Sequence, residues 1–227
     1  MGFFRINEPF MRPCLGNEAR KAVEQWHYSH VCPAFTFGYS FFTPDSKFIG
    51  VVLFGRGANR NIGSPYGLEQ SEVLELVRVA LNGMQGHGQT SRIVAAAIRQ
   101  VREDAGPSLK MLVSYSDQDQ GHAGTIYQAT NWIYAGETGK YRDGWVTPAG
   151  QFIRNRSSDS SLTSHGLGGD SKKEQVEKVY GKGLAPHYTL GRHRYLYPFT
   201  KDMKKVAEAM RQPYPRKGGQ DDSLSAD

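Results

Sequence analysis

The chain contains 227 residues, of which 38% are hydrophobic and 11% aromatic, and its formal net charge is +6. This length is enough to bury a core and suits one domain with an extension at one end. The sequence has no apolar run close to the roughly 20 residues that cross a bilayer, which excludes a membrane-spanning role. Cys14 and Cys32 lack paired spacing and follow no secretory leader, so we expect reduced thiols in a cytoplasm.

Basic charge is concentrated in the C-terminal third of the chain. Residues 151–218 contain 14 Lys and Arg against 6 Asp and Glu, a surplus of 8 by subtraction. Such a surplus favours a polyanionic partner, most commonly nucleic acid, and a solvated basic surface is the alternative. We therefore predict a core at 1–150, a basic extension packed on it at 151–217, and a disordered polar tail at 218–227.

The first part of the chain predicts one helix and three strands. Asn17 can cap a helix whose apolar residues recur at steps of three and four. Alternation of apolar and polar residues, or a short apolar run, then predicts strands over 35–41, 48–54 and 73–81. The stretch 55–70 is rich in Gly and Asn without an apolar period, which indicates a long loop that contacts something.

The middle of the chain alternates helices and strands. A glycine-rich turn at 83–91 leads into a helix that Gly106 and Pro107 end. A strand over 110–115, a helix over 121–130 and a strand over 132–134 follow.

Beyond Trp145 the pattern weakens. It predicts a short helix at 173–180, a strand at 194–199 and a terminal helix around 203–210. The whole order predicts an α/β fold with a basic C-terminal extension.

A polar turn follows the strand at 110–115, at the sheet edge where ligands bind in open α/β sheets. There Asp117 can accept a proton, while Ser114 or Tyr127 can donate a hydrogen bond to an oxygen that gains charge. The alternative is an ordinary turn that satisfies its own backbone, with Tyr127 packed in the core. The turn also contains Ser116, Asp119 and His122, and Glu75 and Arg78 of the preceding strand are second candidates.

The element order resembles the GCN5-related N-acetyltransferase fold, in which a helix after a central strand cradles the pyrophosphate of coenzyme A. This resemblance implies a central, mostly antiparallel sheet flanked by helices. That family's loop has three fixed positions, and Gln85-Gly-His-Gly88-Gln-Thr90 matches the first two but has Thr at the last. The resemblance implies donor binding at the turn, because small residues let backbone N–H groups approach an anion at a helix N-terminus. A flexible helix start is the alternative. The residues assigned to the donor are Gln85, Gly86, Gly88, Thr90 and Ser91.

The chain as a whole more closely resembles the Mom family of phage DNA modification proteins. Four blocks carry this resemblance, of which the first and third are the specific ones. They are Trp26-His-Tyr-Ser29, 50–59, 114–136, and 182–199 with its Arg192-His-Arg-Tyr195.

The Mom resemblance implies transfer of a small acetamido or methylcarbamoyl group to N6 of adenine in DNA, which protects a phage genome from restriction in the bacterial host cytoplasm. The implied partners are double-stranded DNA and a small-molecule group donor. Acetyl-coenzyme A or another small donor, and a bound iron, are left open. The resemblance also makes His27 and Tyr28 candidates for proton transfer, metal binding or base stacking, where core packing is the alternative.

DNA contacts are predicted for the basic extension, because Arg and Lys neutralise phosphates. The target adenine is expected to flip out of the duplex, with Tyr28 or Tyr39 stacking on it. Two other functions are kept: an acetyl-coenzyme A-dependent N-acetyltransferase acting on a small molecule or protein, and a non-catalytic DNA-binding module. The residues assigned to DNA are Arg154, Arg156, Lys172, Lys173, Arg192, His193 and Arg194.

Overall fold

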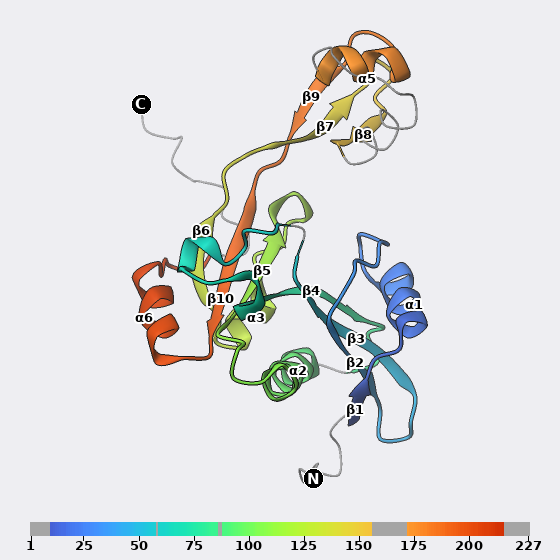
Figure 1. Cartoon of the computed structure of the whole chain (residues 1–227). Helices are drawn as coiled ribbons and strands as arrows, with labels where there is room; N and C mark the ends of the chain where they lie inside the picture. The colour runs from blue at the N-terminus through green and yellow to red at the C-terminus, as the bar shows by residue number, and fades with distance from the viewer. Residues whose placement is uncertain (1–9, 58, 86–87, 156–171, 216–227) are drawn as a thin grey trace, which may run out of the picture. The chain divides into compact units, whose positions relative to one another are not determined.

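The computed structural model describes residues 10–57, 59–85, 88–155 and 172–215, whose contacts form two compact units (Figure 1). Among the described residues, the larger unit comprises 10–57, 59–85, 88–116, 122–136 and 193–215, and the smaller unit comprises 117–121, 137–155 and 172–192. The boundary predicted at residue 150 stays a prediction. The predicted tail at 218–227 lies outside the described residues.

A seven-stranded sheet with the order β1-β2-β3-β4-β5-β10-β6 forms the centre of the fold. The pairs from β1 to β4 are antiparallel, whereas β4 pairs with β5 in parallel. The late strand β10 lies between β5 and β6. The predicted α/β class with a mostly antiparallel sheet is confirmed. The strands are β1 (Phe10–Pro13), β2 (Phe37–Phe42), β3 (Phe48–Gly55), β4 (Val73–Leu81), β5 (Met111–Asp117), β6 (Ile133–Glu137) and β10 (Arg192–Pro198).

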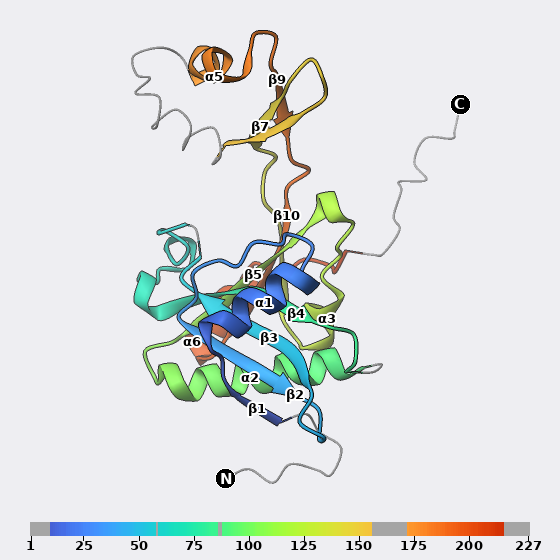
Figure 2. The same cartoon turned by 90° about the vertical axis from the view of Figure 1, so that its right-hand side faces the viewer.

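Helices cover both faces of this sheet (Figure 2). Helix α1 (Gly16–Trp26) packs in one apolar cluster with Val51, and α2 (Gln89–Ala105) packs in another with Val52. Because successive residues of a strand point to opposite faces, these two helices lie on opposite sides of β3. The apolar face predicted for α2 is buried in full, through Ile93, Val94, Ala97, Ile98 and Val101.

Two further helices belong to the larger unit. Helix α6 (Lys201–Ala209) buries Ala207 in a cluster with Leu196 and Met111, and α3 (Thr125–Ala129) buries Tyr127 in the cluster that contains α2. The long loop predicted after β3 and its continuation into β4 contain two short 3-10 helices, η1 (Ser64–Tyr66) and η2 (Gln70–Glu72). None of the helices within the described ranges has the length and apolar character that a bilayer crossing requires.

In its described residues, the smaller unit contains a three-stranded antiparallel sheet with the order β8-β7-β9 and an α-helix that packs on it. Trp145, Ile153, Val176 and Leu184 form its buried core. It also contains the turn after β5, with the short 3-10 helix η3 (Gln118–Gln120). Its other elements are β7 (Arg142–Val146), β8 (Phe152–Arg154), β9 (Ala185–Tyr188) and α5 (Lys172–Tyr180).

Two sequence-based assignments of helix ends are wrong. Helix α1 is capped at Leu15 rather than Asn17, and the backbone N–H of Leu15 donates to the carboxylate of Glu18 at 3.2 Å. The helix predicted over 121–130 is confined to α3, because Gly121 and Gly124 adopt left-handed φ angles of 66° and 62° that interrupt it. Strands β1, β7, β8 and β9 were not predicted.

Candidate functional site

Strands β4 and β5 pair over only three residues and then separate. The parallel pairing joins residues 73–75 to residues 111–113, and both strands continue beyond it. Ser114 is the next residue of β5, and its side-chain oxygen lies 2.8 Å from the carbonyl oxygen of Leu76. A side-chain hydroxyl therefore replaces a backbone donor where the two strands part.

Tyr127 of α3 completes a buried hydroxyl pair with Ser114. The two side-chain oxygens are 2.8 Å apart, and Ser114 is 0% and Tyr127 9% exposed. Because the Leu76 carbonyl only accepts, Ser114 donates to it and Tyr127 donates to Ser114. Burial raises the pKa of Tyr127 to about 12, so this hydroxyl stays protonated near neutral pH. The pair holds the end of β5 to β4.

Three aromatic rings meet beside the end of α1. His27 is the C-cap of that helix, and its ring centroid is 4.4 Å from that of Tyr28. His122, which follows the turn after β5, packs edge to face with Tyr28 at a centroid distance of 5.2 Å. The fold thus brings the His27–Tyr28 pair together with one side chain of the predicted polar turn.

The hydrogen bonds of His27 define its tautomer. Its Nδ1 accepts from the backbone N–H of Ser29 at 3.1 Å and lies 2.9 Å from the Ser29 hydroxyl. A ring nitrogen that accepts from an N–H carries no proton, so the neutral ring is protonated on Nε2. Burial, together with the nearby Arg78 cation, lowers the pKa of His27 to about 4. His27 is therefore a neutral ring with an Nε2–H donor near neutral pH.

The lowered pKa of His27 predicts a loss of stability in mild acid. The unfolded chain binds this proton below about pH 6.5 and the folded chain only near pH 4, so the contribution is complete above pH 6.5 and declines as the pH falls. Between pH 7.5 and 5 the free energy of unfolding should fall by up to about 2 kcal/mol on this account. Urea unfolding at both pH values measures it. His27→Gln should show a smaller decline, and an equal one would contradict the assignment.

Two charged residues of β4 contact neighbouring loops. The Arg78 guanidinium donates to the carbonyl of Val31 at 3.4 Å, which ties β4 to the loop after α1. The Glu75 carboxylate lies against Gly57, where a β-carbon would collide with it. The sequence singles out Glu75 and Arg78 only as charges inside an apolar strand, whereas their surroundings follow from the fold.

Asp117 and Asp119 belong to the smaller unit. The Asp117 carboxylate caps η3 by accepting from the backbone N–H of Asp119 at 3.1 Å. The Asp119 carboxylate in turn accepts from the backbone N–H of Leu190 at 3.1 Å. Asp119 therefore fixes the turn that carries Asp117.

The start of α2 has the features expected of an anion site. Its N-cap is Gly88, in the left-handed conformation with φ 74°, which provides no side-chain cap for the first backbone N–H groups. Thr90 accepts a hydrogen bond from the Gln85 amide at 3.2 Å, and the Ser91 hydroxyl donates to the carbonyl of Gly88 at 3.0 Å. Gly86 lies outside the described residues, and donor binding at this turn stays a prediction.

The residues predicted to contact DNA fall into three groups. Arg154, Lys173 and Arg192 are exposed, and Lys172 is partly exposed. His193 and Arg194 are engaged inside the larger unit: His193 Nδ1 lies 3.0 Å from the Tyr134 hydroxyl, and Arg194 donates to the carbonyl of Ala135 at 2.9 Å. Because His193 is only 8% exposed, neither it nor Arg194 is kept for the DNA surface proposed below. Arg156 lies outside the described residues.

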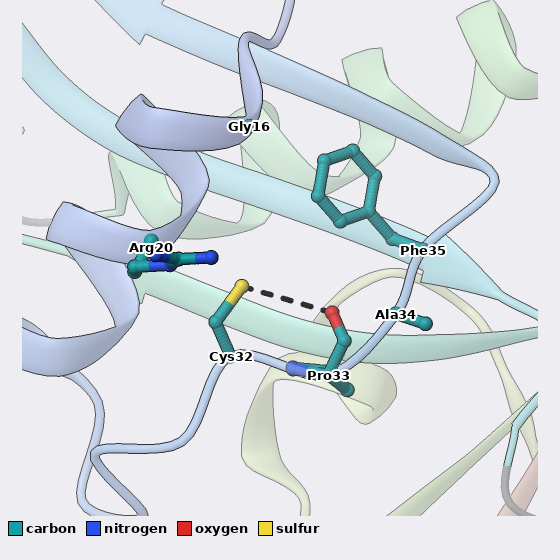
Figure 3. A pocket seen from close by; sticks show the side chains of 6 residues that line it. All are labelled: Gly16, Arg20, Cys32, Pro33, Ala34 and Phe35. Atoms are coloured by element: carbon teal, nitrogen blue, oxygen red, sulfur yellow. Dashed lines mark hydrogen bonds between the residues drawn. The ribbon is translucent and has the colours of Figure 1, made fainter.

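A pocket of about 410 Å³ opens between α1 and the loop that leads to β2 (Figure 3). The Cys32 thiol faces the carbonyl oxygen of Pro33 at 3.7 Å. Burial raises the pKa of Cys32, so the protonated thiol is a poor nucleophile near neutral pH. The pocket is lined by Gly16, Arg20, Cys32, Pro33, Ala34 and Phe35.

The described residues do not fit the ligand set of an iron. Among them, no group of three or more His, Cys, Asp or Glu side chains is placed to hold a metal ion. His27 also presents a proton rather than a lone pair on Nε2, and a metal bond needs the lone pair.

The sequence matches the profile of the Mom protein family over residues 10–216. The methylcarbamoylase mom of Escherichia phage Mu is 28% identical over 120 residues. That match covers 52% of this chain and 49% of the phage Mu protein, so it spans about half of each.

Solved acetyltransferase structures are similar to this chain at low identity. A Bacillus subtilis acetyltransferase in complex with CoA is 10% identical with a TM-score of 0.42, covering 86% of this chain and 99% of its own. The spermidine N-acetyltransferase from Vibrio cholerae in complex with CoA and spermine is 11% identical with a TM-score of 0.43, covering 86% and 98%. Similarity this low does not transfer a substrate or a cofactor.

Proposed function

The chain belongs to the Mom protein family, and from this premise we propose that it is a phage DNA modification enzyme that adds a small acetamido or methylcarbamoyl group to N6 of adenine in DNA. The product would protect the DNA from host restriction enzymes. One observation supports the proposal most: the rings of Tyr28 and His122 lie 5.2 Å apart. The two segments that most specifically resemble the family therefore meet at one site.

The proposed chemistry is transfer of the group from a small-molecule donor to the amino nitrogen of adenine. This nitrogen is a poor nucleophile because its lone pair is delocalised into the ring. As the new N6–C bond forms, the bond to the donor's leaving group breaks, and the leaving group takes that electron pair. Asp117 accepts the proton that N6 loses.

His27 and Tyr28 serve the acceptor side in this proposal. In transfer of a methylcarbamoyl group, N6 attacks the carbonyl carbon, and the Nε2–H of His27 donates a hydrogen bond to the carbonyl oxygen as that oxygen gains charge. A neutral donor fits this role because the pKa of His27 is lowered to about 4. Tyr28 is 47% exposed, which leaves ring surface for a flipped adenine to stack on. Ser114 and Tyr127 act as supports of the β5 end.

The start of α2 serves the donor side. Its uncapped N–H groups suit an anionic part of the donor, such as a pyrophosphate. This feature also favours a second candidate, an acetyl-coenzyme A-dependent N-acetyltransferase that acts on a small molecule or protein. Duplex DNA binding that weakens steeply with salt would separate the two, because a metabolite acyltransferase has no need of it.

Mass spectrometry of nucleosides tests the proposed function directly. DNA is isolated from bacteria that express the chain, digested to nucleosides and compared with DNA from cells that carry an empty vector. We expect a new adenine nucleoside with added acetamido or methylcarbamoyl mass. Unmodified adenine in DNA, despite soluble expression, would contradict the proposal.

Arg192 and Arg194 should differ in their effect on DNA binding. Arg192 is exposed, whereas Arg194 donates to the carbonyl of Ala135 inside the larger unit. Arg192→Ala should lower the slope of log affinity against log salt by about one, the value for one phosphate contact. Arg194→Ala is the matched control and should leave the slope unchanged. Fluorescence anisotropy with a labelled duplex at several salt concentrations measures both slopes. Equal slopes in the two variants would show that Arg192 does not contact a phosphate.

A further inference from the structure

The small sheet of the smaller unit has one covered face. Trp145 of β7 and Ile153 of β8 are directly paired and point to the same side. On that side they pack with Val176 of α5 and with Leu184. Because β8 alternates exposed, buried and exposed residues, its other two side chains point to the opposite face.

The opposite face carries a ring, a cation and an imidazole. Gly144 pairs with Arg154 on one side and with His187 on the other, so these two side chains share a face. Phe152, two residues before Arg154, lies on this face as well and is 41% exposed. We call Phe152, Arg154 and His187 the aromatic face.

The aromatic face is held in a fixed arrangement. The Phe152 ring lies over Gly144, with its Cζ 2.8 Å from where a β-carbon would be, so only glycine admits the ring there. The ring also contacts that of His187 at a centroid distance of 4.8 Å. His187 Nδ1 lies 2.7 Å from the Asp143 carboxylate, which orients the imidazole. A side chain held in this way binds with little loss of conformational freedom.

We propose that the aromatic face binds unpaired nucleotides of opened DNA. A base stacks on Phe152, and Arg154 neutralises a neighbouring phosphate. The inference rests on the proposed function, because an enzyme that modifies N6 of adenine must hold DNA whose bases are accessible. It adds a binding surface for the opened strand outside the proposed catalytic residues.

Charge and surface chemistry favour this occupant over others. The described part of the smaller unit contains eight Lys and Arg against six Asp and Glu, and Arg154 is an exposed cation on the same face as Phe152. Aromatic rings beside basic side chains are the recurrent solution for single-stranded nucleic acid, whereas contacts to a duplex backbone need no exposed ring. An apolar protein partner needs a contiguous apolar patch, but Phe152 is bordered by Arg154 and His187.

Binding of the purified full-length chain to a labelled single-stranded oligonucleotide of mixed sequence tests the proposal. Phe152→Ala should weaken binding at least about tenfold, as loss of one stacked base predicts. Phe152→Leu keeps an apolar side chain of similar size and should lose as much, whereas Phe152→Trp should bind at least as tightly as the wild type. Arg154→Ala should lower the slope of log affinity against log salt by about 0.7, the value for one phosphate contact on a single strand.

Phe10→Ala is the matched control. Phe10 is also a partly exposed aromatic residue of a strand, but it lies on β1 of the larger unit and stacks on Phe42. Its replacement should not change single-strand affinity. Unchanged affinity in both Phe152→Leu and Phe152→Ala, or an equal loss in Phe10→Ala, would overturn the aromatic face as the binding surface.

The nucleoside measurement separates this inference from the proposed function. If cells contain modified adenine but the Phe152 variants bind the single-stranded oligonucleotide as tightly as the wild type, the aromatic face is refuted and the proposed function is retained. Phe152-dependent binding of single strands without any modified adenine would refute the proposed reaction and leave the binding surface standing.

Discussion

Replacing His27 with alanine should reduce the rate of adenine modification at least about a hundredfold, the effect of removing one donor to a developing negative charge. The reason is the tautomer, because Ser29 donates to Nδ1 and so leaves the proton on Nε2. The lowered pKa keeps the ring neutral, so this donor is present throughout the neutral range. Accumulation of the modified nucleoside in expressing cells measures the rate, and anisotropy with duplex DNA should show unchanged affinity.

His30 provides the matched control for this prediction. It is an exposed histidine of the same loop, and its Nδ1 lies 2.7 Å from the carbonyl oxygen of Glu24 on α1. His30→Ala should retain most of the modification. His27→Gln should fall between the two, because an amide also offers an N–H donor. Equal activity in His27→Ala and His30→Ala would remove His27 from the chemistry.

Local patterns explain what the sequence predicted well. The apolar stripe of α2 repeats at the helical period and needs no distant partner to be recognised. The helix predicted over 121–130 was wrong at Gly121 and Gly124, because their left-handed φ angles are set by the turn and not by the apolar pattern around them. Short strands such as β8, with three residues, are defined by pairing and not by their own sequence.

The candidate site was predictable only in part for the same reason. The His27–Tyr28 pair came from a family resemblance, but its contact with His122 joins positions 94 residues apart by subtraction, which no local pattern encodes. His193 and Arg194 appear in the sequence as part of a basic surface. They are engaged in the core because β10 lies inside the sheet, between β5 and β6, and that position depends on the strand order.

Asp117 has a structural and a chemical interpretation, and two substitutions separate them. As a cap, its carboxylate oxygen accepts from the backbone N–H of Asp119. An asparagine side chain can accept the same hydrogen bond, but it cannot take a proton from N6 of adenine. Asp117→Asn should therefore reduce modification about as strongly as Asp117→Ala, at least about a hundredfold.

The stability of the two Asp117 variants should differ although their activities agree. Loss of the cap in Asp117→Ala should lower the free energy of unfolding by about 1 kcal/mol, while Asp117→Asn should stay close to the wild type. Asp119→Asn is the matched control, because its side-chain oxygen can still accept from the N–H of Leu190 and no proton transfer is assigned to it. Urea unfolding and nucleoside mass spectrometry measure the two quantities. If Asp117→Asn retained full modification, the only role of Asp117 would be to cap the turn, because modification would then need the geometry of the turn but not the carboxylate.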